Sequence, residues 1–231
     1  MSASPIAAMF DRISPKYDAL NHLLSFNVDK VWRRKTAKTA SKSHPQAILD
    51  LATGTADLAI LLAKRNLQAR IIGVDISEKM LEIGKEKVKR ENLDNQIELR
   101  VGDAASLPFE EACFDVVTVA FGVRNFEDLE RGLSEIVRVL KPGGTACILE
   151  FSMPEKFPIK QLYDFYFKHL LPKIGKWISK DESAYSYLPN SVEKFPKPHV
   201  FSKTLASLGL ENCLMKQLSF GIATLYTATK K

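Results

Sequence analysis

The segment with the most chemical meaning is a glycine-containing turn that follows an apolar run. Residues Ile48–Asp57 read ILDLATGTAD, a predicted strand whose turn opens a helix. Gly54 lets the backbone approach a ligand closely, and amides at the start of the helix bind polar groups. Asp50 and Thr55 are candidate ligand contacts in the same segment. One glycine does not supply the spacing that a dinucleotide pyrophosphate requires, and an acid here suits a ligand that carries an amino acid and a sulfonium cation.

Two acids at the ends of the next predicted strands extend this candidate site. Asp75 stands 21 residues after Gly54, where a strand-end carboxylate accepts both hydroxyls of a ribose. Its alternative role is to cap the helix that begins near Ser77. Asp103, next to Ala104, follows the third predicted strand, where its side chain could accept the exocyclic amine of an adenine. These positions predict a ligand that contains a nucleoside.

Short apolar runs alternate with helical patterns along the middle of the chain. The runs predict strands at Ala47–Leu51, Arg70–Val74, Ile97–Val101, Phe114–Ala120 and Thr145–Phe151. The helical patterns lie at Asp57–Arg65, Ser77–Glu91 and Phe126–Leu140, and the sequence KPGG ends the last one. Continuous apolar strands separated by helices indicate a parallel sheet covered on both faces. With two antiparallel edge strands at Glu211–Ser219 and Ile222–Thr229, the predicted fold is a doubly wound α/β domain with a mostly parallel seven-stranded sheet.

The rest of the chain adds helices to this sheet. Prolines open two predicted helices at Pro5–Ile13 and Pro15–Leu24, and a basic helical pattern follows at Asp29–Lys42. We predict one domain with four parts: an N-terminal helical cap (1–45), a cofactor-binding core (46–152), a substrate-side insertion (153–200), and a terminal helix with strands (201–231). A chain of this length buries roughly 70% of its unfolded surface, so it needs no disulfide or metal to fold.

Composition and charge narrow the classes of function. Cys113, Cys147 and Cys213 lie in apolar runs without a C-x-x-C pair or a Cys/His cluster, which predicts reduced core residues in a cytoplasmic protein and no metal site. The N-terminus lacks the apolar core of a signal peptide, and no apolar run reaches the ~20 residues of a membrane span. The net charge of +6 favours an anionic partner, which leaves nucleic acid and an anionic lipid surface both open.

The order of the motifs carries a resemblance. The segments DLATGT, VDIS, GDAASLPF, FDVVTVAFG and LKPGG succeed one another as in class I S-adenosylmethionine methyltransferases, which implies S-adenosylmethionine as the cofactor. The flanking segments are similar to the menaquinone/ubiquinone-biosynthesis C-methyltransferase family, especially its demethylmenaquinone members. They read MFDRISPKYDALNHLLSFNVDKVWRR, AFGVRNFED, LEFSMP, LPKIGKWISKDESAYSYLPNSVEKFP and LSFGIATLYTATKK.

This resemblance implies methyl transfer to a ring carbon of demethylmenaquinol, which gives menaquinol. A ubiquinone precursor or another small aromatic is the alternative substrate, and a nucleic acid is the less favoured one. The expected partner is thus a lipophilic quinol and not a nucleic acid. The aromatic and basic segment Phe157–Ile178 fits an isoprenoid tail, with its lysines at lipid headgroups. Its alternative role is to pack on the sheet and on an oligomer partner, so peripheral contact with the inner face of the cytoplasmic membrane and homo-oligomer formation are both expectations.

Two positions depart from the pattern of the family. Ala56 replaces the glycine commonly found before Asp57, and a methyl group is tolerated there if the φ angle is negative. Ala120 stands where many members have a serine, so its backbone keeps a cofactor contact while any hydroxyl contact is lost. Neither change removes a group that the chemistry demands.

The catalytic prediction centres on the FGVRN segment. A quinol hydroxyl has a pKa of about 10, so its deprotonation must be assisted before the ring carbon attacks a methyl group. Arg124 is placed to stabilise the developing phenolate, and its alternative role is a structural ion pair with Asp128. Water relayed by Arg124 and Asn125 is one candidate for the base. The other candidates are Asp181, Tyr185, His199, Tyr17 and His22.

Three rival classes of function remain to be compared. An oxidoreductase with a Tyr-x-x-x-Lys pair is excluded, because Tyr226 and Lys230 fall in a predicted strand that separates them by about 13 Å. Nucleic-acid methyltransferases that act on exocyclic amines carry an Asp/Asn-Pro-Pro-aromatic turn where this chain has Phe121–Asn125. A cofactor-binding module without activity is the third rival, which Ala56 leaves open.

Overall fold

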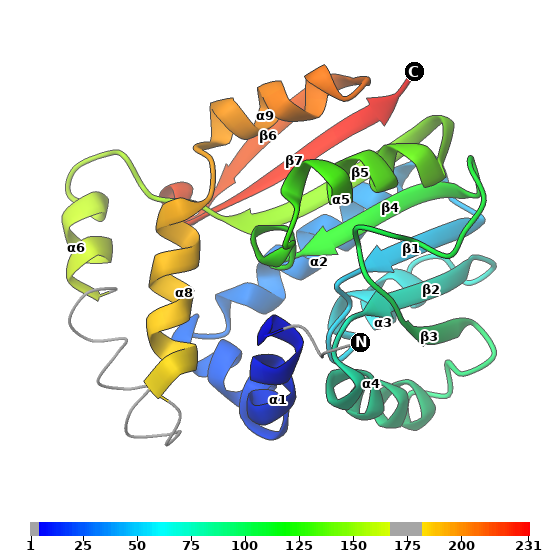
Figure 1. The fold of residues 1–231 in the computed structure, drawn as a ribbon, viewed down its shortest axis with the longest axis horizontal. Helices are drawn as coiled ribbons and strands as arrows, with labels where there is room; N and C mark the ends of the chain where they lie inside the picture. The colour runs from blue at the N-terminus through cyan, green and yellow to red at the C-terminus, as the bar shows by residue number, and fades with distance from the viewer. Residues whose placement is uncertain (1–4, 167–181) are drawn as a thin grey trace.

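The computed structural model describes residues 5–166 and 182–231 and is built on a central sheet. Seven strands run in the order β3-β2-β1-β4-β5-β7-β6 (Figure 1). Strands β1 to β5 are mutually parallel, whereas β7 is antiparallel to both β5 and β6, as predicted. The bounds are Ala47–Leu51 (β1), Arg70–Asp75 (β2), Ile97–Val101 (β3), Phe114–Ala120 (β4), Leu140–Phe151 (β5), Leu210–Leu218 (β6) and Ala223–Lys230 (β7).

Helices cover both faces of the sheet, which explains why its central strands are apolar without alternation. On one face Leu49 and Val117 pack with α5 (Leu129–Val139) and α9 (Pro198–Ser207). On the other face Ile48 and Val116 pack with α2 (Val28–Ala40), α3 (Asp57–Ala63) and α4 (Glu78–Arg90). Successive residues of a strand point to opposite faces, so each central strand contributes to two cores.

Two helix starts are set by side-chain caps. Ser77 accepts a hydrogen bond from the Met80 backbone N–H, as its position before Glu78 indicated. Asp128 accepts one from the Arg131 N–H, so α5 begins at Leu129 and not at the predicted Phe126. The residues in between form a short 3-10 turn, Val123–Asn125.

The two predicted N-terminal helices are one continuous helix, α1 (Pro5–Leu24), with Pro15 inside it. A proline in a helix leaves the carbonyl four residues earlier without its N–H donor. Here that carbonyl belongs to Asp11, and the Ser14 hydroxyl donates to it at 3.0 Å. This local replacement lets the helix run through the proline.

The fifth strand is longer than predicted. The KPGG segment was expected to end a helix, but β5 already begins at Leu140, which pairs with Phe114 of β4. A register shift between Phe114 and Val116 absorbs the irregular residues, and Gly143 has a φ angle of +76°. The strand therefore takes in the turn residues through a bulge.

The carboxyl ends of the parallel strands face a separate group of helices. Helices α1 and α8 (Glu182–Lys194) lie beyond these ends, and α6 (Ile159–Phe165) lies outside α8 (Figure 1). Of the Phe157–Ile178 segment, the structure describes residues 157–166, which include α6. The remainder lies outside the described residues. Ligands of open α/β sheets bind at such carboxyl ends, so the search for a site begins here.

Candidate active site

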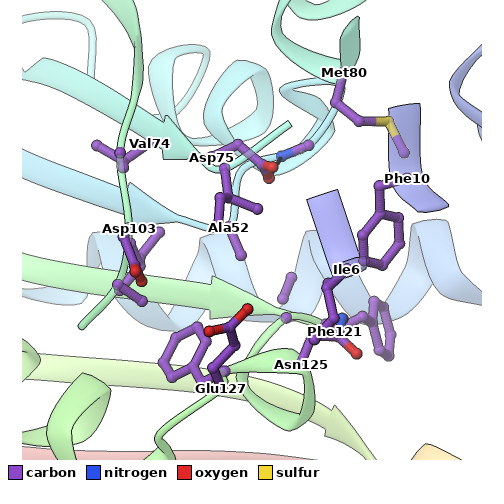
Figure 2. Close-up of a pocket in the computed structure, with 18 of the residues that line it drawn as sticks. Ile6, Phe10, Ala52, Val74, Asp75, Met80, Asp103, Phe121, Asn125 and Glu127 are labelled. Atoms are coloured by element: carbon purple, nitrogen blue, oxygen red, sulfur yellow. Dashed lines mark hydrogen bonds between the residues drawn. The ribbon is translucent and has the colours of Figure 1, made fainter. Parts of the chain in front are cut away.

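A cavity opens at the carboxyl ends of β1, β2 and β4. Figure 2 shows Asp75 and Asp103 at strand ends and Ile6 and Phe10 coming from α1 across the cavity. The wall is mostly apolar, with a few polar groups, as in typical small-molecule sites. Its lining consists of Ile6, Phe10, Tyr17, Leu51, Ala52, Gly54, Val74, Asp75, Ile76, Met80, Gly102, Asp103, Ala104, Ala120, Phe121, Gly122, Asn125, Phe126 and Glu127.

The turn after β1 presents its backbone to this cavity. Gly54 has a φ angle of +55°, and a Cβ atom built on it would meet no atom within 4 Å. The space beside it is therefore open to a ligand. The Gly54 N–H donates to Asp75 Oδ2 at 2.7 Å, and the Thr53 N–H donates to the Val74 carbonyl at 3.0 Å. These bonds fix the turn to the end of β2.

Asp75 supports the turn after β1 and the start of α4. Besides Gly54, the Ser77 N–H donates to its Oδ1 atom at 2.9 Å, so Asp75 holds the residue that caps α4 and is not the cap itself. Burial raises the pKa of Asp75, and hydrogen bonds from Ser77 and Gly54 oppose that rise. A carboxylate oxygen accepts more than one hydrogen bond, so each oxygen retains capacity for a ligand hydroxyl. These structural bonds and a ligand contact are therefore compatible.

Three other predicted cofactor contacts also line the cavity. Asp103 is exposed, and its Oδ1 atom accepts a hydrogen bond from the Ala105 N–H at 2.9 Å. Ala104 and Ala120 also line this space. Their roles as cofactor contacts stay predictions, with a geometry that fits them.

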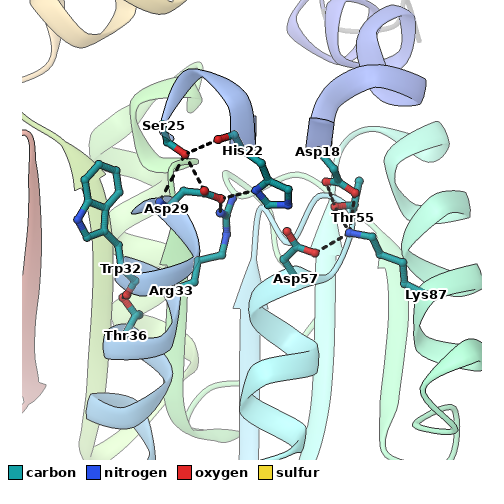
Figure 3. Close-up of polar contacts among 10 residues, drawn as sticks. All are labelled: Asp18, His22, Ser25, Asp29, Trp32, Arg33, Thr36, Thr55, Asp57 and Lys87. Atoms are coloured by element: carbon teal, nitrogen blue, oxygen red, sulfur yellow. Dashed lines mark hydrogen bonds and ion pairs between the residues drawn. The ribbon is translucent and has the colours of Figure 1, made fainter. Parts of the chain in front are cut away.

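Asp50 and Thr55 lie behind the cavity and not on its wall. Asp50 is 1% exposed and accepts hydrogen bonds from the hydroxyls of Thr53 and Thr118, each at 2.6 Å. Burial raises its pKa to about 6, although the two threonine hydroxyls lower it. The Thr55 hydroxyl donates to Asp18 at 2.6 Å and accepts from Lys87 at 3.0 Å (Figure 3). Both residues hold the turn from outside, because their side chains are already committed.

Helix α1 is fastened across the cavity by polar contacts to α3 and α4. Lys87 of α4 pairs with Asp18 at 2.6 Å and with Asp57 of α3 at 2.5 Å (Figure 3). Near the other end of α1, the Ser77 hydroxyl donates to Asp11 at 2.6 Å. The helix thus forms a wall that shields the cavity from water, a role that the sequence did not reveal.

A methyl group at Ala56 was expected to be tolerated if the φ angle is negative, and the structure does not meet this condition. The φ angle of Ala56 is +65°, in the left-handed region, and the residue is fully buried. An alanine in this region costs roughly 1–2 kcal/mol relative to the right-handed form. A glycine would avoid that strain, so Ala56 is held in this conformation by the surrounding turn.

Arg124 is buried in an ion pair, with Glu150 and not Asp128. Its Nη1 atom donates to Glu150 Oε1 at 2.7 Å and to the Phe121 carbonyl at 2.5 Å. Its Nε atom donates to Ser191 Oγ of α8 at 3.3 Å. Asp128 instead caps α5. The sequence analysis did not identify Glu150. An acid inside the apolar run ILEF could have indicated it, but nothing in the sequence indicates its partner.

Asn125, unlike Arg124, lines the cavity. Its side-chain amide donates to the Phe121 carbonyl at 3.4 Å, and its Oδ1 atom accepts from the Tyr187 hydroxyl of α8 at 2.9 Å. Helix α8 therefore contacts both residues of the RN pair, through Tyr187 and Ser191. Its sequence lies in the insertion expected to face the substrate.

The candidate bases are placed unequally. Tyr17 lines the cavity, and burial raises the pKa of its hydroxyl, while Arg33 and Arg124 oppose the rise. His22 hydrogen-bonds Asp29 at 2.9 Å, and Arg33 pairs with the same carboxylate (Figure 3). The other three are away from the cavity or not described: His199 is exposed on α9, the side chain of Tyr185 is not described, and Asp181 lies outside the described residues.

Comparison with known sequences gives a consistent result over nearly the whole chain. A family model described as the ubiE/COQ5 methyltransferase family matches residues 2–230. A protein of Bacteroides fragilis named demethylmenaquinone methyltransferase is 48% identical over 225 residues, which cover 97% of this chain and 92% of that one. A protein of Geotalea daltonii named ubiquinone/menaquinone biosynthesis C-methyltransferase UbiE is 46% identical over 226 residues, covering 97% and 96%.

Solved structures confirm the fold. The crystal structure of the [4+2]-cyclase SpnF matches with a TM-score of 0.74 and 16% identity, covering 99% of this chain and 96% of that one. An S-adenosylmethionine-dependent methyltransferase of Thermotoga maritima, described as a possible histamine N-methyltransferase, matches with a TM-score of 0.67 and 18% identity, covering 98% and 100%. One fold thus carries different chemistries, so the reaction must be argued from the site.

Proposed function

Because the chain belongs to the ubiE/COQ5 methyltransferase family, we propose that it methylates a ring carbon of demethylmenaquinol to give menaquinol. The enzyme is an S-adenosylmethionine-dependent methyltransferase. The observation that carries the proposal is the cavity at the carboxyl ends of β1, β2 and β4. It is supported by relatives named demethylmenaquinone methyltransferase, which this chain matches over nearly their full length.

The cavity fits S-adenosylmethionine, which supplies an electrophilic methyl group when bound. Gly54 leaves open the space that any Cβ atom would enter, and Asp75 keeps acceptor capacity for ribose hydroxyls. The apolar side chains of Ile76 and Met80 suit the faces of an adenine, with Asp103 as acceptor for its amine. We assign Gly54, Asp75, Asp103, Ala104 and Ala120 as direct contacts, with Asp50 and Thr55 as supports of the turn.

Two further residues of the cavity wall, Tyr17 and Asn125, are suited to handle the quinol. Tyr17 keeps its proton at neutral pH, because burial raises its pKa, so it serves as a hydrogen-bond donor and not as the base. Asn125 is oriented by Tyr187 and can hold a substrate oxygen or a water. The positive charge of Arg124 acts in the cavity, since it opposes the rise in the pKa of Tyr17 that burial causes. It therefore favours a phenolate there over the neutral quinol.

The surface and assembly of the protein are further parts of the proposal. In the described parts of the chain, no helix combines the length and apolarity needed to cross a bilayer. We place the protein at the inner face of the cytoplasmic membrane, where a lipophilic quinol resides, and exposed Phe26, Phe157 and Phe220 support this contact. Homo-oligomer formation and the division into cap, core, insertion and terminal part stay predictions.

A methyl-transfer assay tests the proposed function directly. The purified protein is incubated with S-adenosylmethionine carrying a labelled methyl group and chemically reduced demethylmenaquinone, and the quinone is analysed by mass spectrometry. We expect one labelled methyl on the ring. Parallel reactions with a demethylated ubiquinone precursor and with RNA serve as comparisons. A protein that binds the cofactor but does not label the naphthoquinol would overturn the proposal.

A further inference from the structure

A second cavity lies beside the first and is almost entirely apolar. Its volume is about 340 Å³, within the range of small-molecule sites. It lies between the α1–α2 corner, α6, α8 and the turn that joins β6 to β7. The lining residues are Asn21, Ser25, Phe26, Val28, Trp32, Phe151, Ile159, Leu162, Tyr163, Tyr166, Leu188, Ser219, Phe220 and Ile222.

Two polar pairs at this lining are satisfied within the protein. Trp32 Nε1 donates to Ser219 Oγ at 3.0 Å, and the Ser25 hydroxyl donates to Asp29 at 2.6 Å. The chamber therefore offers aromatic and aliphatic surface with little demand for hydrogen bonds. A ligand that carries charge or many hydroxyls would lose hydration here without replacement.

A single layer of aromatic rings separates the two cavities. Phe121 lines the first cavity, while Trp32 and Phe151 line the second. The ring centroids of Phe121 lie 6.0 Å from Trp32 and 4.5 Å from Phe151. The two cavities are thus close neighbours. One elongated ligand that passes this layer would have one end in each cavity.

The outer side of the chamber is also apolar. Phe26, Leu162 and Phe220 line it, yet they are 75%, 63% and 79% exposed. Phe26 and Phe220 have φ angles of +52° and +60°, and Phe121 on the partition has +61°. Bulky residues rarely adopt this conformation, and such strain concentrates at functional sites. Phenylalanines with this strained backbone thus lie both at the outer side of the chamber and at its partition from the first cavity.

We propose that this chamber binds the isoprenoid tail of the quinol, with the ring on the far side of the Phe121 partition. The inference depends on the proposed function for the identity of the ligand and extends it to where the tail lies. An isoprenoid chain is slender, apolar and without hydrogen-bonding groups, which matches the lining. The exposed Phe26 and Phe220 mark the end where a long tail leaves toward lipid.

Equilibrium dialysis with labelled farnesol and geraniol tests the chamber without using catalysis. These alcohols carry three and two isoprene units and no quinone ring. We expect saturable binding of farnesol by the full chain, with geraniol bound roughly tenfold less tightly because less apolar surface is buried. Leu188→Trp, which fills the chamber, should weaken farnesol binding by at least roughly tenfold.

Leu67→Trp is the matched control, because Leu67 is 77% exposed and does not line the chamber. It should bind farnesol like the wild type. Thermal melting checks that Leu188→Trp is folded, and Leu188→Phe replaces it if it is not. Absence of saturable farnesol binding, or equal binding by the Leu188 and Leu67 variants, would overturn the inference.

The same variants in the methylation assay separate this inference from the proposed function. We expect kcat/KM to rise with tail length from the tailless naphthoquinol to the triprenyl compound, and this rise to vanish in Leu188→Trp. Methylation at equal kcat/KM for all tails would leave the function intact and remove the tail site. Farnesol binding by a protein that methylates no naphthoquinol would leave the apolar binding site intact and overturn the proposed function.

Discussion

Hydrogen bonds behind the cavity shape the cofactor turn as much as the residues on its surface. Asp50 joins the turn to β4, since its oxygens accept from Thr53 and Thr118. Asp75 joins the same turn to β2 through the Gly54 N–H. The two acids therefore have separate duties, one buried and one at the ligand, and they should respond differently to substitution.

Substitution of Asp75 should weaken ligand binding. Asp75→Ala removes the acceptors proposed for the ribose, so S-adenosylmethionine should bind more weakly by roughly 1.5–3 kcal/mol, the scale of hydrogen bonds to a charged group. Isothermal calorimetry measures the change. Asp94→Ala, at an exposed turn, is the control and should keep the wild-type affinity. Unchanged affinity in a folded Asp75 variant would remove this residue from the site.

Substitution of Asp50 should appear in the pH dependence of stability. Burial raises its pKa from 3.8 to about 6, so the folded state holds a proton that the unfolded state has lost. This contribution is complete below the unfolded pKa and is lost as pH rises through about 6. Asn does not titrate, so the Asp50→Asn variant does not lose stability in this way as the pH rises. Its free energy of unfolding relative to wild type should therefore rise by up to about 3 kcal/mol from pH 4 to pH 7.5.

Urea denaturation at several pH values tests this difference. Wild type and Asp50→Asn need only be compared with each other, because all other titrating groups are shared. Parallel pH profiles of the two proteins would show that Asp50 ionises like an exposed carboxyl. The prediction concerns the turn and not the cofactor, because the side chain does not line the cavity.

Several elements meet at the Arg124–Glu150 pair. Arg124 lies in the turn after β4, Glu150 lies at the end of β5, and Ser191 comes from α8. Glu150 Oε1 also accepts from the Phe151 N–H at 2.8 Å. The pair thus connects the substrate-side helix to the sheet.

Breaking this pair should destabilise the protein strongly. Arg124→Ala leaves the fully buried Glu150 without its cation and should lower the free energy of unfolding by about 3–5 kcal/mol. Arg124→Met combined with Glu150→Leu should recover most of that loss. The exposed Arg100–Glu98 pair provides the control, where Arg100→Ala should cost less than about 1 kcal/mol. Equal denaturation midpoints for Arg124→Ala and wild type would contradict a structural role.

The elements themselves were largely readable from the sequence. Strands β1, β3 and β4 have the predicted bounds, because buried parallel strands are short apolar runs. The continuity of α1 was not readable, since it depends on one hydroxyl beside Pro15. Nor were the left-handed backbones of Phe26, Phe121 and Phe220, because phenylalanine is not a residue type that signals this conformation.

The site was predicted less completely than the sheet. Gly54, Asp75, Asp103 and Asn125 line the cavity, since strand-end positions place them at one edge of the sheet. Asp50 was expected beside the ligand, but it pairs in register with Thr118 of β4 and bonds to it. Glu150, the closing helix α1 and the second chamber depend on contacts between distant segments, which no local pattern encodes.

At the scale of the whole molecule, the cavity is enclosed by parts that are distant in sequence. Helix α1 covers it from the N-terminus, β1, β2 and β4 supply its floor, and α8 reaches it through Tyr187 and Asn125. A ligand that bridges these parts stabilises all of them against unfolding. Binding of the correct cofactor should therefore raise the thermal stability of the entire domain, and a wrong cofactor should not.

S-adenosylmethionine at 100 times its Kd should add about 2.7 kcal/mol of stability, since it binds only the folded state. For a domain of this size, that addition raises Tm by about 5–11 °C. NADH should produce no shift, because the turn has a single glycine, Gly54, and so lacks the glycine spacing that a dinucleotide pyrophosphate requires. Differential scanning fluorimetry measures both ligands on the same preparation. A saturable shift with NADH that S-adenosylmethionine competes away would contradict the assignment of the cavity.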